Sequence, residues 1–151
     1  MDARQRAEPW ARDRLGRPIP DDSPERADHG VAVDEPRGPH DTVTTAERLL
    51  ARGFPFAAHE VFEARWKACT PEERELWQGL AQWCVAITHD ARGNAVGAER
   101  LRRRSLAHLT TPEATAAAAR LGMDLSPLTA WLDKPAAELP TLGVPPTGNS
   151  P

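Results

Sequence analysis

RELWQGLAQWCVAITHDARGN, residues 74–94, is the stretch of sequence that decides the fold. Its apolar side chains recur at helical spacing on one side: Leu76, Leu80, Trp83, Cys84 and Ile87. The opposite side carries Gln78, Gln82, Val85 and His89 at similar spacing, with alanines between the two stripes. A helix with so little strongly polar surface is typical of a central helix that packs on more than one side.

Helix-start signals surround this stretch. Thr44-Thr45-Ala46-Glu47 and Thr70-Pro71-Glu72-Glu73 have the pattern of capping boxes, and Pro55 suits the first position of a helix. The signals predict helices over residues 44–52, 55–69, 70–92, 94–109 and 111–122, and a short one from Ser126. Strand-type alternation is absent. We therefore expect an all-α fold, a compact single-domain bundle of five to six helices over residues 41–134.

The two ends of the 151-residue chain have a different composition. Residues 1–40 are rich in Arg, Asp, Glu, Pro and Gly, without sustained periodicity. Such a segment buries too little apolar area to offset its ordering entropy, so we expect a disordered tail. The same reasoning predicts a second disordered tail over residues 135–151.

The charge and the cysteines bound the class of protein. The formal net charge is -3, which disfavours binding to nucleic acid or to anionic membranes. The arginines of residues 100–104 point several ways around a helix and are expected to be solvated. No apolar run is long enough to span a bilayer and no secretory signal is present, so we expect a cytoplasmic protein without membrane contact. Cys69 and Cys84 fall in helix patterns typical of buried, reduced thiols.

A metal site is one hypothesis for the polar residues. His59 and Glu63 are four positions apart, so both could reach one ion from a single helix. His89 could add a third ligand if its helix faces theirs. Nitrogen and oxygen ligands of this kind suit zinc, iron, manganese or nickel. The alternative is that His59 and Glu63 form hydrogen bonds within the core and fix the register of the helices.

A pocket without metal is the second hypothesis. A histidine beside a carboxylate can act as a general base, and Gln78, Gln82 and Asn94 could orient a polar small molecule. The alternative is that Gln78, Gln82 and His89 form the wet side of an amphipathic helix. No nucleophile stands out, because Cys84 lies on the apolar stripe.

Three motifs carry a family resemblance. They are His-Glu-x-x-Glu-x-x-Trp at 59–66, Gln-Gly-Leu-x-Gln at 78–82 and His-x-x-x-Gly-Asn-x-x-Gly-Ala at 89–98. Together, over about residues 45–110, they resemble the small helical family catalogued as domain of unknown function 309. The resemblance implies a compact bundle of prokaryotic origin and no particular activity. Thr88 stands where we expect an aromatic residue in that family.

The leading hypothesis is therefore a cytosolic, non-catalytic binding or structural module whose polar residues join helices. The alternative is a metal- or small-ligand-dependent, hydrolase-like enzyme that uses His59, Glu63 and His89. In either case a homo-oligomer is conceivable, because the helix face of Leu128 and Trp131 could stay uncovered in so small a core.

Overall fold

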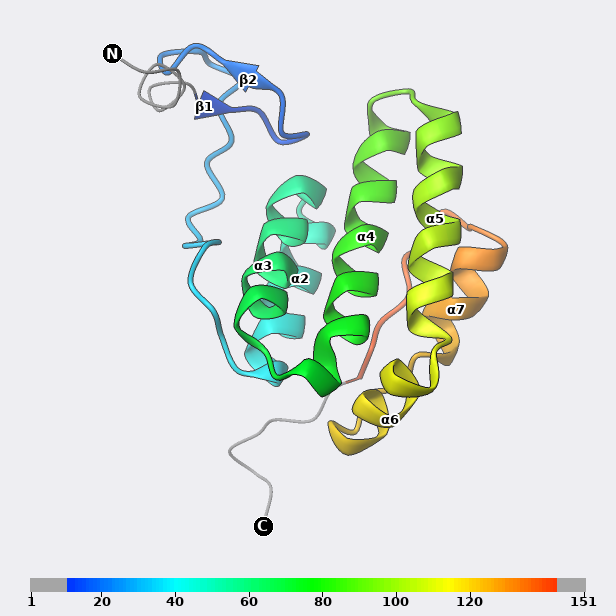
Figure 1. Cartoon of the computed structure of the whole chain (residues 1–151). Helices are drawn as coiled ribbons and strands as arrows, with labels where there is room; N and C mark the ends of the chain where they lie inside the picture. Colours follow the sequence, from blue (N-terminus) through cyan, green and yellow to red (C-terminus); the bar gives the residue numbers. More distant parts are fainter. Residues whose placement is uncertain (1–10, 144–151) are drawn as a thin grey trace.

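The computed structural model describes residues 11–143, and most of them lie in α-helices (Figure 1). A two-stranded antiparallel hairpin precedes the helices, with Ala11 opposite Ile19. The predicted all-α class is confirmed. In chain order the elements are β1 (Ala11–Arg12), β2 (Pro18–Ile19), α2 (Pro39–Ala51), α3 (Pro55–Ala68), the 3-10 helix η1 (Pro71–Glu73), α4 (Arg74–Ala91), α5 (Ala95–Leu109), α6 (Pro112–Arg120) and α7 (Ser126–Asp133).

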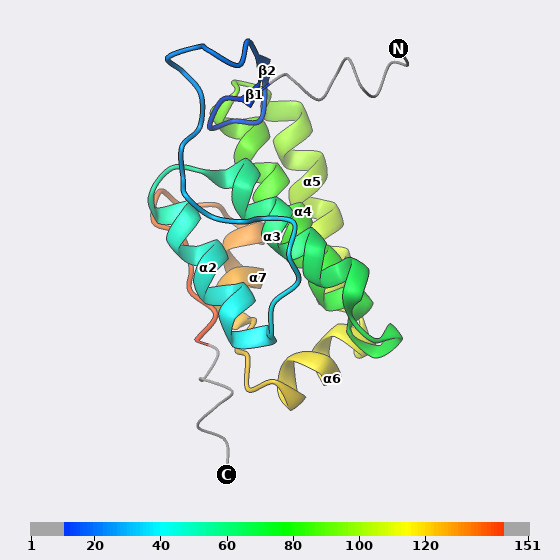
Figure 2. The same ribbon diagram turned by 90° about the vertical axis from the view of Figure 1, so that its left-hand side faces the viewer.

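The helices form two layers. Helices α3, α4 and α5 form one layer, in which the middle helix α4 is antiparallel to both neighbours, and α2 and α7 cover one side of this layer (Figures 1 and 2). Helix α6 closes one end. The side chains of Leu76, Trp77, Leu80, Trp83 and Cys84 on α4 are fully buried. The prediction of a central helix within residues 70–92 is therefore correct, although its α-helical part begins only at Arg74.

The two predicted capping boxes do not form. Helix α2 begins at Pro39, five residues before Thr44, with proline in its first turn and the Thr42 amide donating to the Gly38 carbonyl at 2.9 Å. Glu47 accepts a hydrogen bond from the Leu142 amide instead of capping α2. Thr70 makes no side-chain cap, and a 3-10 turn leads into α4. A side chain that the local pattern assigns to a helix cap, such as Glu47, can thus form its hydrogen bond with a residue far away in the sequence.

Two other helix starts agree with the sequence. Asn94 accepts a hydrogen bond from the Gly97 amide at 3.0 Å and caps α5. Thr111 accepts one from the Ala114 amide at 3.1 Å and caps α6. Each cap satisfies a backbone N–H group that the helix itself leaves without a partner.

The segment before α2 differs from the expected disordered tail wherever the structure describes it. Residues 11–19, the N-terminal hairpin, contain Leu15 and Asp13, both more than nine-tenths buried. Residues 20–38, the N-terminal arm, run from the hairpin along α2 and α3 to the start of α2 (Figure 2). Val31 and Val33 of the arm pack against the core. Single apolar and charged anchors, without periodicity, therefore suffice to hold this segment on the bundle.

The C-terminal segment also packs on the bundle as far as it is described. Leu142 is fully buried, and its carbonyl accepts a hydrogen bond from the Asp124 amide at 3.2 Å. Trp131 donates from its indole to the Ala136 carbonyl at 2.9 Å. Leu128 is fully buried, whereas Trp131 on the same helix is half-buried, so the chain itself covers only part of this face. None of the helices over residues 11–143 has the length and apolar character needed to cross a membrane.

Candidate functional site

His59 and Glu63 form a pair on α3. The two ring nitrogens of His59 face oxygen acceptors, with Nδ1 3.0 Å from the Phe56 carbonyl and Nε2 3.1 Å from Glu63 Oε2. The other carboxylate oxygen of Glu63 lies 3.1 Å from Lys67 Nζ. Burial pushes the pKa of Glu63 up, but the Lys67 hydrogen bond and the His59 charge outweigh it and leave this pKa lowered. The pair is therefore part of a chain of contacts along α3 that runs from the Phe56 carbonyl to Lys67.

His89 has a different partner. Asn94 donates from Nδ2 to Nδ1 of His89 at 3.1 Å while its Oδ1 accepts from the Gly97 amide. This set of bonds spans the turn between α4 and α5. His89 and Asn94, two of the residues singled out by the sequence, thus fix the geometry of a helix connection.

The structure does not assemble the predicted metal ligands as a set. Within residues 11–143, no three His, Cys, Asp or Glu side chains are arranged to hold a metal ion. His59 and Glu63 are brought together, as their spacing predicts, but His89 is bound to Asn94. Gln78 and Gln82 are half-buried on α4. Gln82 Oε1 is buried and has no hydrogen-bond partner in the described part of the chain.

A second polar cluster, which the sequence did not reveal, ties α3 to the start of α4. Glu73 Oε1 accepts hydrogen bonds from Arg65 Nη2 at 2.8 Å and from Trp77 Nε1 at 2.7 Å. Arg65 also lies over the Trp77 ring and donates to the Arg37 carbonyl of the arm. Burial pushes the pKa of Glu73 up, but the two donors and the Arg65 charge leave it lowered. The spacing of four residues between Glu73 and Trp77 is a local signal for their hydrogen bond. The contact of Arg65 with Glu73 depends on how α3 packs against α4 and has no such signal in the sequence.

Small and polar residues join α4 to α5. Ser105 donates from Oγ to the Gly79 carbonyl at 2.8 Å, and His108 Nδ1 lies 2.6 Å from Glu75 Oε2. A Cβ atom at Gly79 would stand 2.7 Å from the side chain of Leu109, closer than packed atoms allow. The glycine of the Gln-Gly-Leu motif is therefore required for the close approach of these two helices.

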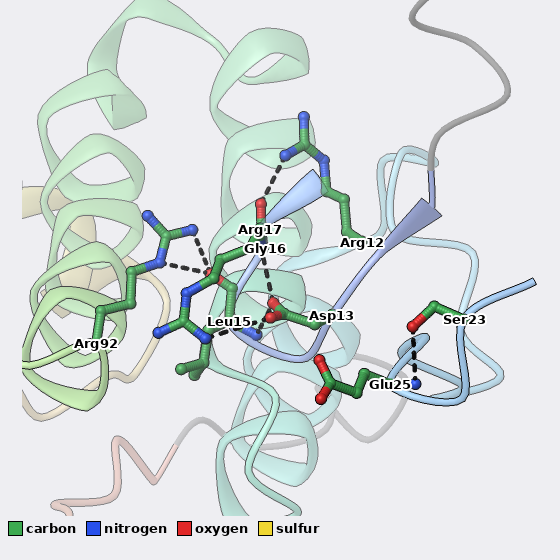
Figure 3. Close-up of polar contacts among 8 residues, drawn as sticks. All are labelled: Arg12, Asp13, Leu15, Gly16, Arg17, Ser23, Glu25 and Arg92. Atoms are coloured by element: carbon green, nitrogen blue, oxygen red, sulfur yellow. Dashed lines mark hydrogen bonds and ion pairs between the residues drawn. The ribbon is translucent and has the colours of Figure 1, made fainter. Parts of the chain in front are cut away.

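The N-terminal hairpin covers the beginning of α3 (Figure 3). Arg92 at the end of α4 donates two hydrogen bonds to the Leu15 carbonyl, one of them at 3.0 Å from Nε. The side chain of Asp13 accepts from the amides of Leu15 and Arg17, both at 2.9 Å, and holds the turn closed. Gly16 sits directly on the ring of Phe56. The hairpin is thus anchored to two helices that lie far from it in sequence.

The covered turn of α3 includes the histidine motif. The ring centroids of Phe56 and His59 are 5.0 Å apart, and Arg12 of the hairpin lies over the Phe56 ring. Burial raises the pKa of Glu60, and the charges of His59 and Arg12 offset only part of this rise. Glu60 is therefore only partly accessible to solvent, because this part of α3 lies beneath the hairpin.

The chain was compared with protein-family models, with curated proteins and with solved structures. Residues 43–101 match the model described as Domain of unknown function (DUF309). The chain resembles this family. The match runs from α2 into α5 and contains all three motifs, so the resemblance inferred from them is confirmed. It leaves out the N-terminal hairpin, the arm and His108. No curated protein and no solved structure matches the chain.

Proposed function

We propose that this DUF309-like chain is a non-catalytic binding or structural module. The observation that carries the proposal is that the polar motif residues with defined contacts bond to groups of their own chain. His59 bonds within α3, and His89 and Asn94 span the turn between α4 and α5. The Gly79 carbonyl of the second motif accepts a hydrogen bond from Ser105, which lies outside the motifs, and so links α4 to α5. Side chains used in this way stabilise the arrangement of the helices, which presents a surface to a ligand or partner.

The contacts of His89 favour this proposal over the enzyme alternative. A metal-dependent, hydrolase-like enzyme that uses His59, Glu63 and His89 requires the three side chains to converge on one ion. Instead, Nδ1 of His89 accepts from Asn94, and both oxygens of Glu63 lie beside His59 and Lys67. A hydrogen-bonding role accounts for these contacts without any ligand.

We also propose a cytoplasmic location and, from the family resemblance, a prokaryotic origin. Both cysteines are free thiols, which supports a reducing compartment. Cys84 is fully buried, and burial raises the pKa of its thiol well above the usual range. Cys84 is thus suited to packing and unsuited to nucleophilic chemistry.

His59→Ala tests the structural role. The substitution removes the bonds to Phe56 and Glu63, so we expect urea unfolding to show a loss of about 1 kcal/mol. Asn94→Ala is the matched control, because removal of a helix cap also costs about 1 kcal/mol. Native mass spectrometry after addition of zinc or manganese should show no stoichiometric metal that depends on His59. Unchanged stability together with a metal ion lost only from His59→Ala would contradict the proposal.

A further inference from the structure

A cavity lies between the N-terminal arm and helix α2. Its volume is about 620 Å³, within the range of small-molecule sites. The arm supplies one wall through residues 30–32 and Arg37, and α2 supplies the other between Asp41 and Arg52. The wall formed by the arm lies outside residues 43–101, so the family match contains only half of this cavity.

The arm is fastened to α2 at both ends of the cavity. Arg52 donates from Nη1 to the His29 carbonyl at 3.0 Å. Arg37 donates from Nη2 to the Ala32 carbonyl at 2.8 Å and lies 3.7 Å from Asp41. These contacts shape the cavity before any ligand arrives, which lowers the entropic cost of binding.

The lining combines positive charge with an apolar floor. Three arginines, Arg37, Arg48 and Arg52, face one carboxylate, Asp41. This local excess of positive charge contrasts with the formal net charge of -3 for the whole chain. Val31, Ala32 and Ala51 supply the accessible apolar part of the lining, whereas Leu49 at the same place is fully buried.

Arg48 is the arginine that is left for a ligand. The side chains of Arg37 and Arg52 are engaged with the arm, but the Arg48 side chain has no hydrogen bond or ion pair with any described residue. A guanidinium presents its donors in a planar fork that matches carboxylate and phosphate oxygens. Arg52 lies one helical turn after Arg48, and its guanidinium could also donate to a carboxylate or phosphate group in the cavity.

We propose that this cavity binds a small organic anion, with a phosphate or carboxylate group on Arg48 and an apolar body against Val31 and Ala51. This proposal names a class of ligand for the binding module proposed above. It rests on that proposed function only in treating the ligand as bound and not chemically converted. It is independent of His59, so failure of one does not imply failure of the other.

Calorimetric titration of the full chain with phenyl phosphate tests the proposal. We expect saturable one-to-one binding that weakens with added salt. Arg48→Ala should weaken it at least about tenfold, since a hydrogen bond to a charged group is lost. Arg100→Ala is the matched control: Arg100 is also exposed, lies on α5 away from the cavity and should leave binding unchanged. Both side chains are exposed, so both variants should keep the wild-type unfolding midpoint.

Inorganic phosphate and phenol separate the two parts of the ligand. Each should bind more weakly than phenyl phosphate, because each engages only the arginine or only the apolar floor. Equal binding of inorganic phosphate would overturn the assignment to an organic anion. Absence of saturable phenyl phosphate binding, or equal weakening by Arg48→Ala and Arg100→Ala, would overturn the site.

Discussion

The contact between α4 and α5 and the contact between the N-terminal hairpin and α3 both place a glycine against a large side chain. Gly79 lies against Leu109 between two helices, whereas Gly16 lies against Phe56 from the loop, residues 13–17, of a short hairpin. The first contact joins two helices, α4 and α5, that are consecutive in the chain. The second depends on the bond between Leu15 and Arg92, 77 positions apart. The comparison suggests that the helix pair unfolds with the core, while the hairpin can open by itself.

The largest expected effect is at Gly79. Gly79→Val places methyl groups where Leu109 is already buried, and overpacking of this kind should lower the free energy of unfolding by about 3 kcal/mol. Thermal or urea unfolding measures the loss. Gly38→Val is the control, because no atom lies within 4 Å of a Cβ atom built there, and it should cost less than about 1 kcal/mol. Equal effects would mean that the α4–α5 contact is not tight.

Glu73→Gln should have the next largest effect, about 1–2 kcal/mol at neutral pH, because the hydrogen bonds from Arg65 and Trp77 lose a charged acceptor. The folded-state pKa of Glu73 lies below its ordinary value of 4.5, so its contribution is present above that pH and is lost as the pH falls through the folded-state pKa. Urea titrations across this range should therefore show wild type and variant converging in acid. Glu99→Gln, which breaks an exposed pair with Arg103, should cost at most about 0.5 kcal/mol. A difference that persists in acid would contradict the role of the charge.

The smallest effect on global stability is expected at Gly16. Gly16→Ala puts a side chain on a residue with φ +79° and a Cβ atom 2.1 Å from the Phe56 ring, so the hairpin should detach. Hydrogen exchange should become faster at the amides of residues 13–17, with the amides of α4 unchanged. Gly30→Ala has a similar φ of +72° but open space around it, and should leave the hairpin protected. An unfolding midpoint that falls as far as in Gly79→Val would contradict the independence of the hairpin.

The sequence by itself determined the helical part of the fold. Helical spacing of Leu76, Leu80 and Trp83 predicts the buried side of α4, and the caps at Asn94 and Thr111 follow from local chemistry. The pair of His59 and Glu63 follows from a spacing of four residues. These features are local, because each depends on groups within about one helical turn.

The tertiary structure decided which polar groups meet across elements. Packing pairs Glu47 with the Leu142 amide and Glu73 with Arg65. His89 bonds to Asn94 and does not join His59 and Glu63. The hairpin lies over Phe56, and the arm lies beside Arg48. None of these pairings has a periodic signature, since each depends on how helices and irregular segments pack in three dimensions. Local patterns determine a helix and its caps, but only packing determines which distant side chain satisfies each remaining polar group.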